Sequence, residues 1–294
     1  SNILTKRYNA TFYTNTLSTA DNDGKLINWN FQNYNVFSWE IKPKLHSNMR
    51  KIFLTLLFIC ATAFCSYSFP IESVRFHCEN DTTKINRLLT ESISADLRTP
   101  NEYMSFFADK LLGTPYVAHT LEGEQEYLTI NIDELDCTTF VETLIALTKA
   151  AMSKSPTWYA YAAKLENIRY RGGQLDGYSS RLHYISAWIV ENTSRGNFHE
   201  ETAYIPHAES IVKSLNYMTS HRDSYPALSD STEFAAIKQF ETGYNMHMYP
   251  YINKRDLKRK DVIENLRDGD IICLTTKTEG LDVSHLGIVR FVKG

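Results

Sequence analysis

The sequence predicts an α+β fold. Segments with the three- and four-residue apolar spacing of amphipathic helices fill most of its middle part, and short β-branched segments close it. Helices that precede the strands, rather than alternating with them, are typical of this fold class. The chain has 294 residues, of which 43% are hydrophobic and 22% charged, so it can build a sizeable core within one domain or two.

The first predicted helices lie between Ser73 and Leu112. Apolar side chains recur at helical spacing over residues 82–97, and a second helix is expected over residues 101–113, where Pro100 precedes the start and a glycine ends the segment. Residues 113–126 are expected to form a loop.

The segment 127–151, YLTINIDELDCTTFVETLIALTKAA, predicts a strand that leads into a helix. Apolar residues alternate over 127–135, and a strongly helical pattern starts at Cys137. Further helices are expected over 155–170 and 181–196, with a turn-rich segment between them, whereas residues 199–261 show few clear periods. The closing strands are expected over residues 268–277 and 283–292.

Cys137 is the candidate nucleophile. A thiol in the first turn of a helix lies at the positive end of the helix dipole, which favours the thiolate that acyl transfer requires. Asp136 is a suitable N-cap residue for such a helix. The alternative is a buried structural cysteine, which is the commoner role of an arbitrary cysteine.

His285 is the candidate base. It lies within a strand-like apolar segment and directly precedes Leu286 and Gly287, where a small residue lets another backbone or a substrate approach. A histidine in such a strand can also be a satisfied core residue. The helix-start thiol shifts the interpretation towards catalysis.

Composition excludes several classes of function. The formal net charge of −3 argues against nucleic-acid binding, which usually requires a basic excess. No CxxC pair, HExxH motif or EF-hand loop occurs, so no metal site is expected. Glycine-rich nucleotide-binding loops are also missing from the sequence, and no cofactor is expected.

Residues 49–66 have the pattern of a secretory signal peptide. Met49 and two basic residues precede an apolar run over 52–63, with small residues for cleavage at its end. The run is shorter than the ~20 residues that span a bilayer, so no stable membrane span is expected. Export to the periplasm or the extracellular space follows, with a lipid anchor at Cys65 as the weaker alternative.

The predicted domain organisation follows from that leader. Residues 1–48, rich in asparagine, threonine and aromatics, are expected to be an upstream extension that is not native or is disordered. The catalytic domain is expected over residues 70–294. The oligomeric state is left open by the sequence.

Four blocks together resemble the N-acetylmuramoyl-L-alanine amidase-like family of the NlpC-type, papain-like cell-wall hydrolases. The blocks are LLGTPYVAHTLEGE, DELDCTTFVETLIAL, IRYRGGQLDGYSSRLHYISAWIVEN and DGDIICLTTKTEGLDVSHLGIV, in the family's order. The resemblance covers roughly Asn101 to the C-terminus. It implies a papain-like fold, with helices packed on a small antiparallel sheet.

The resemblance also implies an activity and a substrate. Cys137 would be the nucleophile and His285 the base, and Tyr116, in the GTPY block, would orient the substrate carbonyl or the thiol. The substrate would be peptidoglycan or its muropeptide fragments, cleaved between the muramoyl lactyl group and L-alanine. An endopeptidase of the same fold that cuts within the stem peptide, and a wall-binding module without catalysis, are the alternatives.

Candidate substrate-binding residues lie in the third block. Stem peptides carry free carboxylates, which arginine binds bidentately, so Arg169, Arg171 and Arg181 are candidates for their recognition. His183 and Tyr184 could line the same groove.

One expected feature of the resemblance is missing. In such enzymes a third polar residue orients the histidine from the strand after it, and the sequence ends at Gly294 before that strand. The catalytic domain is therefore expected to be C-terminally incomplete, and this chain to be impaired as an enzyme.

Overall fold

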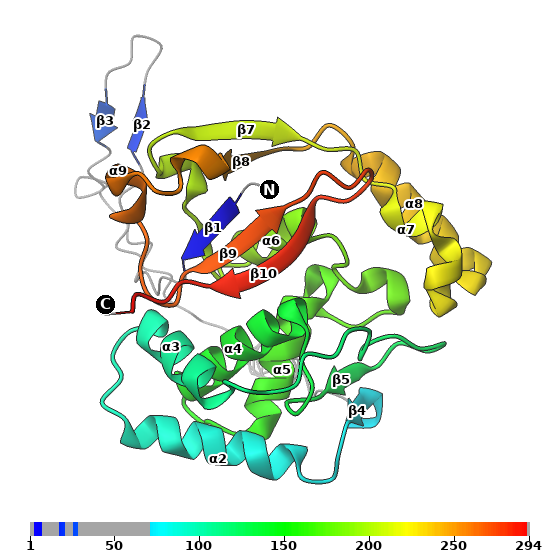
Figure 1. Cartoon of the computed structure of the whole chain (residues 1–294). Helices are drawn as coiled ribbons and strands as arrows, with labels where there is room; N and C mark the ends of the chain where they lie inside the picture. The colour runs from blue at the N-terminus through cyan, green and yellow to red at the C-terminus, as the bar shows by residue number, and fades with distance from the viewer. Residues whose placement is uncertain (1–2, 8–17, 21–25, 29–70, 293–294) are drawn as a thin grey trace, which may run out of the picture. The chain divides into compact units, whose positions relative to one another are not determined.

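The computed structural model describes residues 3–7, 18–20, 26–28 and 71–292 (Figure 1). It divides into a unit of residues 1–10 with 71–294 and a unit of residues 11–70. In the second unit, β2 (Ser18–Ala20) pairs antiparallel with β3 (Leu26–Asn28). The predicted leader, with Cys65, lies outside the described residues. The domain boundaries and the nature of residues 1–48 remain predictions.

The larger unit contains helices and a sheet, which confirms the predicted α+β class. Helix α4 (Cys137–Ala151) is central, because it packs against α2, α3 and α5 and against strand β10 (Figure 1). The other α-helices are α2 (Asp81–Ser94), α3 (Pro100–Lys110), α5 (Trp158–Arg169), α6 (Ile185–Ser194), α7 (Tyr217–Ser220), α8 (Ser231–Tyr244) and α9 (Lys260–Ile263). Short 3-10 turns are η2 (Ile71–Ser73), η3 (Arg171–Gly173), η4 (Tyr178–Ser180), η5 (Thr202–Tyr204), η6 (Arg222–Ser224), η7 (Pro226–Ser229) and η8 (Lys254–Asp256).

The main sheet has the strand order β10-β9-β1-β8-β7, and a short strand β6 also pairs with β1. All of its pairings are antiparallel. Within the described residues, β10 is therefore one edge of the sheet. The strands are β1 (Ile3–Arg7), β6 (His199–Glu200), β7 (Ala208–Val212), β8 (Met248–Ile252), β9 (Ile271–Thr275) and β10 (Val283–Ile288).

Two shorter strands form a separate parallel pair. β4 (Val74–Phe76) runs beside β5 (Leu128–Ile130), and Arg75 lies opposite Thr129. The sequence predicts a longer strand over 127–135. The observed strand stops earlier because the Asn131 side-chain oxygen accepts hydrogen bonds from the backbone N–H groups of Asp133 and Glu134, which turns the chain towards α4.

Strand β10 contains a β-bulge. Val283 lies opposite Thr275, but His285 lies opposite Leu274, so β10 carries one extra residue. The burial pattern follows this shift: Val283 and Leu286 are buried, whereas Ser284 and His285 between them are both exposed.

The start of α3 and the buried face of α4 both follow from their local sequences. Thr99 caps α3 in a capping box with Glu102, and Pro100 takes the first helical position. Helix α4 buries Val141, Leu144 and other apolar side chains completely, as its pattern predicts.

Within the described residues, no helix is both long and apolar enough to cross a membrane.

Candidate active site

Cys137 occupies the first position of α4, as the sequence predicts. The Asp136 carboxylate accepts a hydrogen bond of 2.7 Å from the Thr139 backbone N–H, and the Asp136 N–H donates to the Thr139 hydroxyl at 2.8 Å. This reciprocal cap fixes the helix start and holds the half-buried thiol at the end where backbone N–H groups are free.

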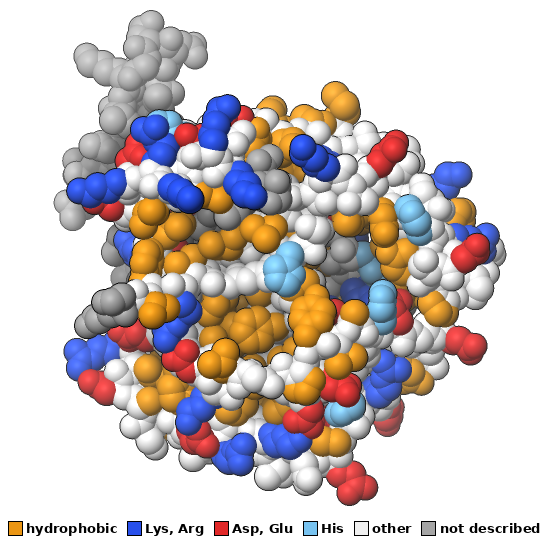
Figure 2. All heavy atoms as spheres, in the orientation of Figure 1, with side chains coloured by type: hydrophobic (Ala, Val, Ile, Leu, Met, Phe, Trp, Pro, Cys, Tyr) orange, Lys and Arg blue, Asp and Glu red, His pale blue; other side chains and the backbone are white. Residues whose placement is uncertain are grey.

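Cys137 and His285 line one cavity of about 340 Å³. Tyr116 and Asp136 line it as well, so the structure brings the predicted nucleophile, base and orienting residue together. The remaining walls are largely apolar and come from the end of α3, from α4 and from β10. Figure 2 shows hydrophobic side chains gathered between β10 and these helices.

His285 reaches this cavity from the edge strand of the sheet. Its side chain is exposed, and the bulge places it on the outward face beside Ser284. The structure therefore excludes the alternative of a satisfied core histidine.

Tyr116 lies in the loop before β5 and is 64% exposed. A parallel bridge joins its backbone to Leu135, directly before the start of α4. Partial burial of the hydroxyl raises the pKa of Tyr116, and the neighbouring Cys137 sulfur, a hydrogen-bonding partner, raises it further. The phenol is thus protonated at neutral pH and can donate a hydrogen bond.

A second cavity of about 190 Å³ adjoins the first, since Asp136 lines both. Arg169, Arg181, His183 and Tyr184 lie in its wall, together with Thr138. The two cavities therefore meet at the start of α4. Four of the five predicted substrate-binding residues surround the second cavity, and none of them lines the Cys137 cavity.

The guanidinium groups of Arg169 and Arg181 are both engaged inside the protein. Arg169 is 3% exposed; its Nε donates to Glu142 at 2.7 Å and its Nη1 to the Thr129 carbonyl at 2.8 Å. Arg181 donates to Glu122 at 2.7 Å, and its guanidinium lies 4.7 Å from the centre of the Tyr178 ring. These contacts account for both charges without a ligand.

Arg171 lies outside both cavities. Its guanidinium is 3.7 Å from the Glu191 carboxylate and 4.4 Å from the centre of the Phe240 ring. The structure does not bring this arginine to the predicted nucleophile.

His183 and Tyr184 are held by internal hydrogen bonds. His183 Nε2 lies 2.9 Å from the Tyr178 carbonyl, and burial, helped by the charge of Arg181, lowers the pKa of His183 well below its usual value. The Tyr184 hydroxyl donates to Glu241 at 2.7 Å and accepts from the Met218 N–H at 3.0 Å. Tyr184 is only 2% exposed and is part of the core.

A buried acid that the sequence did not single out anchors the histidine strand. Asp282 precedes β10, is fully buried, and accepts a hydrogen bond of 2.6 Å from the Ser186 N–H in the first turn of α6. Burial raises the pKa of Asp282. Its position directly before a predicted strand carries no signal for this long-range cap, because Ser186 lies far away in the sequence.

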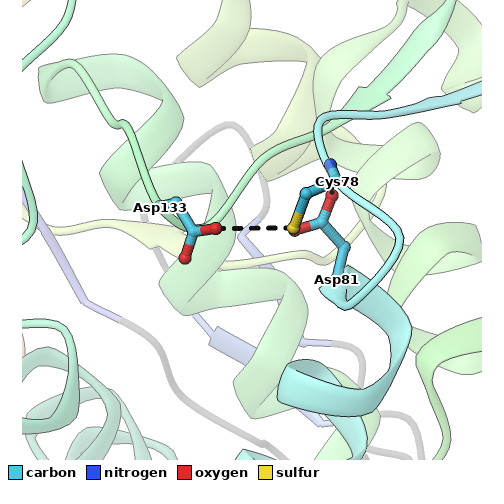
Figure 3. A group of neighbouring side chains, drawn as sticks. All are labelled: Cys78, Asp81 and Asp133. Carbon is cyan, nitrogen blue, oxygen red and sulfur yellow. Dashed lines mark hydrogen bonds between the residues drawn. The ribbon is translucent and has the colours of Figure 1, made fainter.

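The described residues contain one group with the donors of a metal site, formed by Cys78, Asp81 and Asp133 (Figure 3). The ammonium group of Lys84 is hydrogen-bonded to Asp133 and lies 3.6 Å from the Cys78 sulfur. Lys84 thus pairs with Asp133, and the Asp81 carboxylate accepts a hydrogen bond of 2.8 Å from the Cys78 backbone N–H, so each carboxylate has a partner within the protein.

The fold and this site define an α+β protein in which a helix-start cysteine and a strand histidine face one cavity. Residues 106–293 match the model of the family described as N-acetylmuramoyl-L-alanine amidase-like, and the chain belongs to this family. No curated protein matches the chain.

Solved structures are also similar to this chain. A crystal structure of an N-acetylmuramoyl-L-alanine amidase from Bacteroides uniformis has 40% sequence identity and a TM-score of 0.60, covering 66% of this chain and 81% of that one. A Bacteroides fragilis protein provisionally named a xylanase has 40% identity and a TM-score of 0.58, covering 62% and 80%. A Legionella pneumophila protein at 20% identity, with a TM-score of 0.56 over 73% and 81%, shares the fold.

Proposed function

We propose that the protein is an exported cysteine amidase that hydrolyses the bond between N-acetylmuramic acid and L-alanine in peptidoglycan or its muropeptide fragments. The observation that carries this proposal is the shared cavity of Cys137 and His285 at the start of α4. The family and the Bacteroides uniformis relative support the bond that is cleaved. The papain-like, NlpC-type assignment of the fold belongs to the same proposal.

The reaction follows from the groups in the cavity. His285 takes the thiol proton, and the sulfur of Cys137 attacks the lactyl carbonyl to form a tetrahedral intermediate. The free N–H groups at the start of α4, with the Tyr116 hydroxyl, stabilise the oxyanion. His285 then protonates the leaving amine of L-alanine. Water, deprotonated by His285, hydrolyses the thioester and releases the sugar acid and the thiol.

Glycoside hydrolysis is a poorer fit to this site. It generally requires two carboxyl groups that flank the scissile bond. Among the described residues, Asp136 is the only acidic one that lines the Cys137 cavity, and one of its oxygens is used in the helix cap. The two glutamates of the adjoining cavity are paired with Arg169 and Arg181.

Digestion of defined muropeptides tests the proposal. An amidase releases the sugar with a free lactyl acid and a stem peptide with a free L-alanine amine, whereas an endopeptidase releases a shortened peptide, and mass spectrometry separates the two. We expect Cys137→Ala to abolish hydrolysis with an unchanged circular dichroism spectrum, and the control Cys78→Ser to retain it. Wild-type turnover by Cys137→Ala would show that the nucleophile is wrongly assigned.

Export is tested separately. Secreted or periplasmic material from the native host is expected to lack residues 49–66, which intact-mass measurement detects. Mature protein that retains this segment would contradict the proposed leader.

A further inference from the structure

A third cavity lies on the polar face of the β4–β5 pair. Its volume is about 280 Å³. Arg75 on β4 lies opposite Thr129 on β5, and His77 and Asn131 follow two residues further along each chain. Alternate residues of paired strands share a face, so these four polar side chains form one wall of the cavity. The intervening Leu128 and Ile130 are buried on the opposite face.

Several polar groups of this cavity have unused hydrogen-bonding capacity. The hydroxyls of Thr120 and Thr129 are buried without a hydrogen-bond partner among the described residues, and Thr129 is only 5% exposed. A buried polar group left unpaired loses its hydrogen bonds to water without replacement, so such groups are normally satisfied. A ligand or water in the cavity is the partner within reach.

Arg75 supplies a positive charge to the cavity. Its Nη2 donates to the Thr120 carbonyl at 3.4 Å, and its guanidinium lies 5.8 Å from the centre of the Tyr127 ring. Within the described part of the chain it forms no ion pair with a carboxylate. Arg169, Arg171 and Arg181 differ in this respect, because each is already paired with a glutamate.

This set of groups favours a carboxylate ligand. A guanidinium binds a carboxylate through two parallel hydrogen bonds, and neighbouring hydroxyls can donate to the same oxygens. Glu134 lines the cavity too, 4.0 Å from His77 Nδ1, and its negative charge opposes a doubly charged anion such as phosphate more strongly than a singly charged carboxylate.

The cavity is close to the proposed nucleophile along the chain. Glu134 lines it, whereas the next residue, Leu135, lines the Cys137 cavity. Glu134 and Cys137 are three positions apart in the sequence, so their Cα atoms are at most about 11 Å apart. An extended stem peptide, which gains roughly 3.3–3.6 Å per residue, covers that distance in about three residues.

We propose that Arg75, with Thr120 and Thr129, binds a free carboxylate of the peptidoglycan stem peptide and so selects substrates with an extended stem. This inference rests on the proposed amidase function, and it assigns stem recognition to an arginine outside the third sequence block.

Kinetics on two substrates tests the assignment. For a muropeptide with a tripeptide stem, we expect Arg75→Gln to lower kcat/KM by about 10- to 100-fold, as expected for loss of a charged hydrogen bond. For N-acetylmuramoyl-L-alanine, which lacks the rest of the stem, kcat/KM should stay unchanged. Arg87→Gln, at an exposed arginine of α2, is the matched control. Equal loss on both substrates would overturn the proposal.

Direct binding separates this inference from the proposed reaction. Calorimetry with Cys137→Ala protein and the free tripeptide L-alanine–D-glutamate–diamino acid is expected to show binding that Arg75→Gln and Thr129→Val each weaken. Peptides amidated at one carboxylate at a time identify the group that is bound, and inorganic phosphate is expected not to compete. Unchanged tripeptide affinity in folded Arg75→Gln protein would refute the subsite even if hydrolysis proceeds. A protein that binds the tripeptide through Arg75 but releases no sugar acid would instead refute the amidase function.

Discussion

The buried pair of Arg169 and Glu142 is expected to stabilise the fold rather than to bind substrate. Both side chains are 3% exposed, and the Arg169 Nε lies 2.7 Å from the Glu142 carboxylate. Replacing Arg169 by methionine leaves that carboxylate buried without its partner and removes the hydrogen bond to the Thr129 carbonyl. Breaking one side of such a pair typically costs about 3–5 kcal/mol.

The expected loss can be converted into a melting temperature. For a domain of this size each kcal/mol shifts Tm by about 2–4 °C, so Arg169→Met should lower Tm by about 6–20 °C. The double variant Arg169→Met with Glu142→Leu also removes the unpaired Glu142 carboxylate and should recover most of the decrease in Tm. Apolar replacements of buried ion pairs often leave the free energy of unfolding unchanged.

Urea unfolding and thermal melting of the single and double variants measure these differences. The matched control is Arg87→Met, whose side chain is exposed and whose ion pair with Glu91 should contribute less than about 1 kcal/mol. An unchanged Tm in Arg169→Met, combined with weaker binding of the muropeptide, would refute the reasoning and make Arg169 a substrate contact.

Two further predictions concern reactivity and pH. Cys137 should react with iodoacetamide at least about tenfold faster than Cys78 or Cys273 at neutral pH. Cys273 is buried, and partial burial beside Asp81 and Asp133 raises the pKa of the Cys78 thiol. Peptide mapping measures the labelling rates, and equal labelling of the three cysteines would contradict this prediction. Because the pKa of His183 is lowered in the folded protein, the unfolded chain binds the proton more readily. As the pH drops below about 6.5, the free energy of unfolding should therefore decrease by up to about 1.4 kcal/mol per pH unit, until the folded-state pKa is reached. Urea unfolding measured from about pH 7 to pH 5 should show that the free energy of unfolding changes less with pH in His183→Gln than in the wild type. The same pH dependence in both proteins would be evidence against a buried neutral His183.

The parts of the fold that sequence predicts well are those that local interactions decide. The start of α4 is an example, because Asp136 and Thr139 form the cap within one turn. Helix α8 shows the opposite case. It buries few side chains, so its period is weak, yet Asp230 accepts hydrogen bonds from the N–H groups of Thr232 and Glu233. The DSTE sequence at its start was the signal that could have revealed it.

The roles of the arginines could not be inferred from their sequence neighbourhood. Arg169 finds Glu142 across 27 positions and Arg181 finds Glu122 across 59, so nothing local distinguishes a structural guanidinium from a ligand-binding one. Arg75 is the opposite case, a proposed ligand-binding arginine that the sequence did not single out. Its strand has only three residues, too few for a pattern that would predict a strand or a site there. Its importance depends on the pairing with β5, which only the fold supplies.

The bulge in β10 gives the length of this strand a consequence for its evolution. If the same residues paired without the bulge, strand alternation would place His285, two positions after the buried Val283, on the inward side and turn the imidazole away from the thiol. Deletion of Ser284 would instead leave Val283, His285 and Leu286 in regular alternation, with the imidazole still on the outward side. Because Asp282 anchors the start of this strand on α6, active relatives are expected either to keep the bulge, with point substitutions tolerated at the exposed Ser284, or to lack this residue and pair as a regular strand.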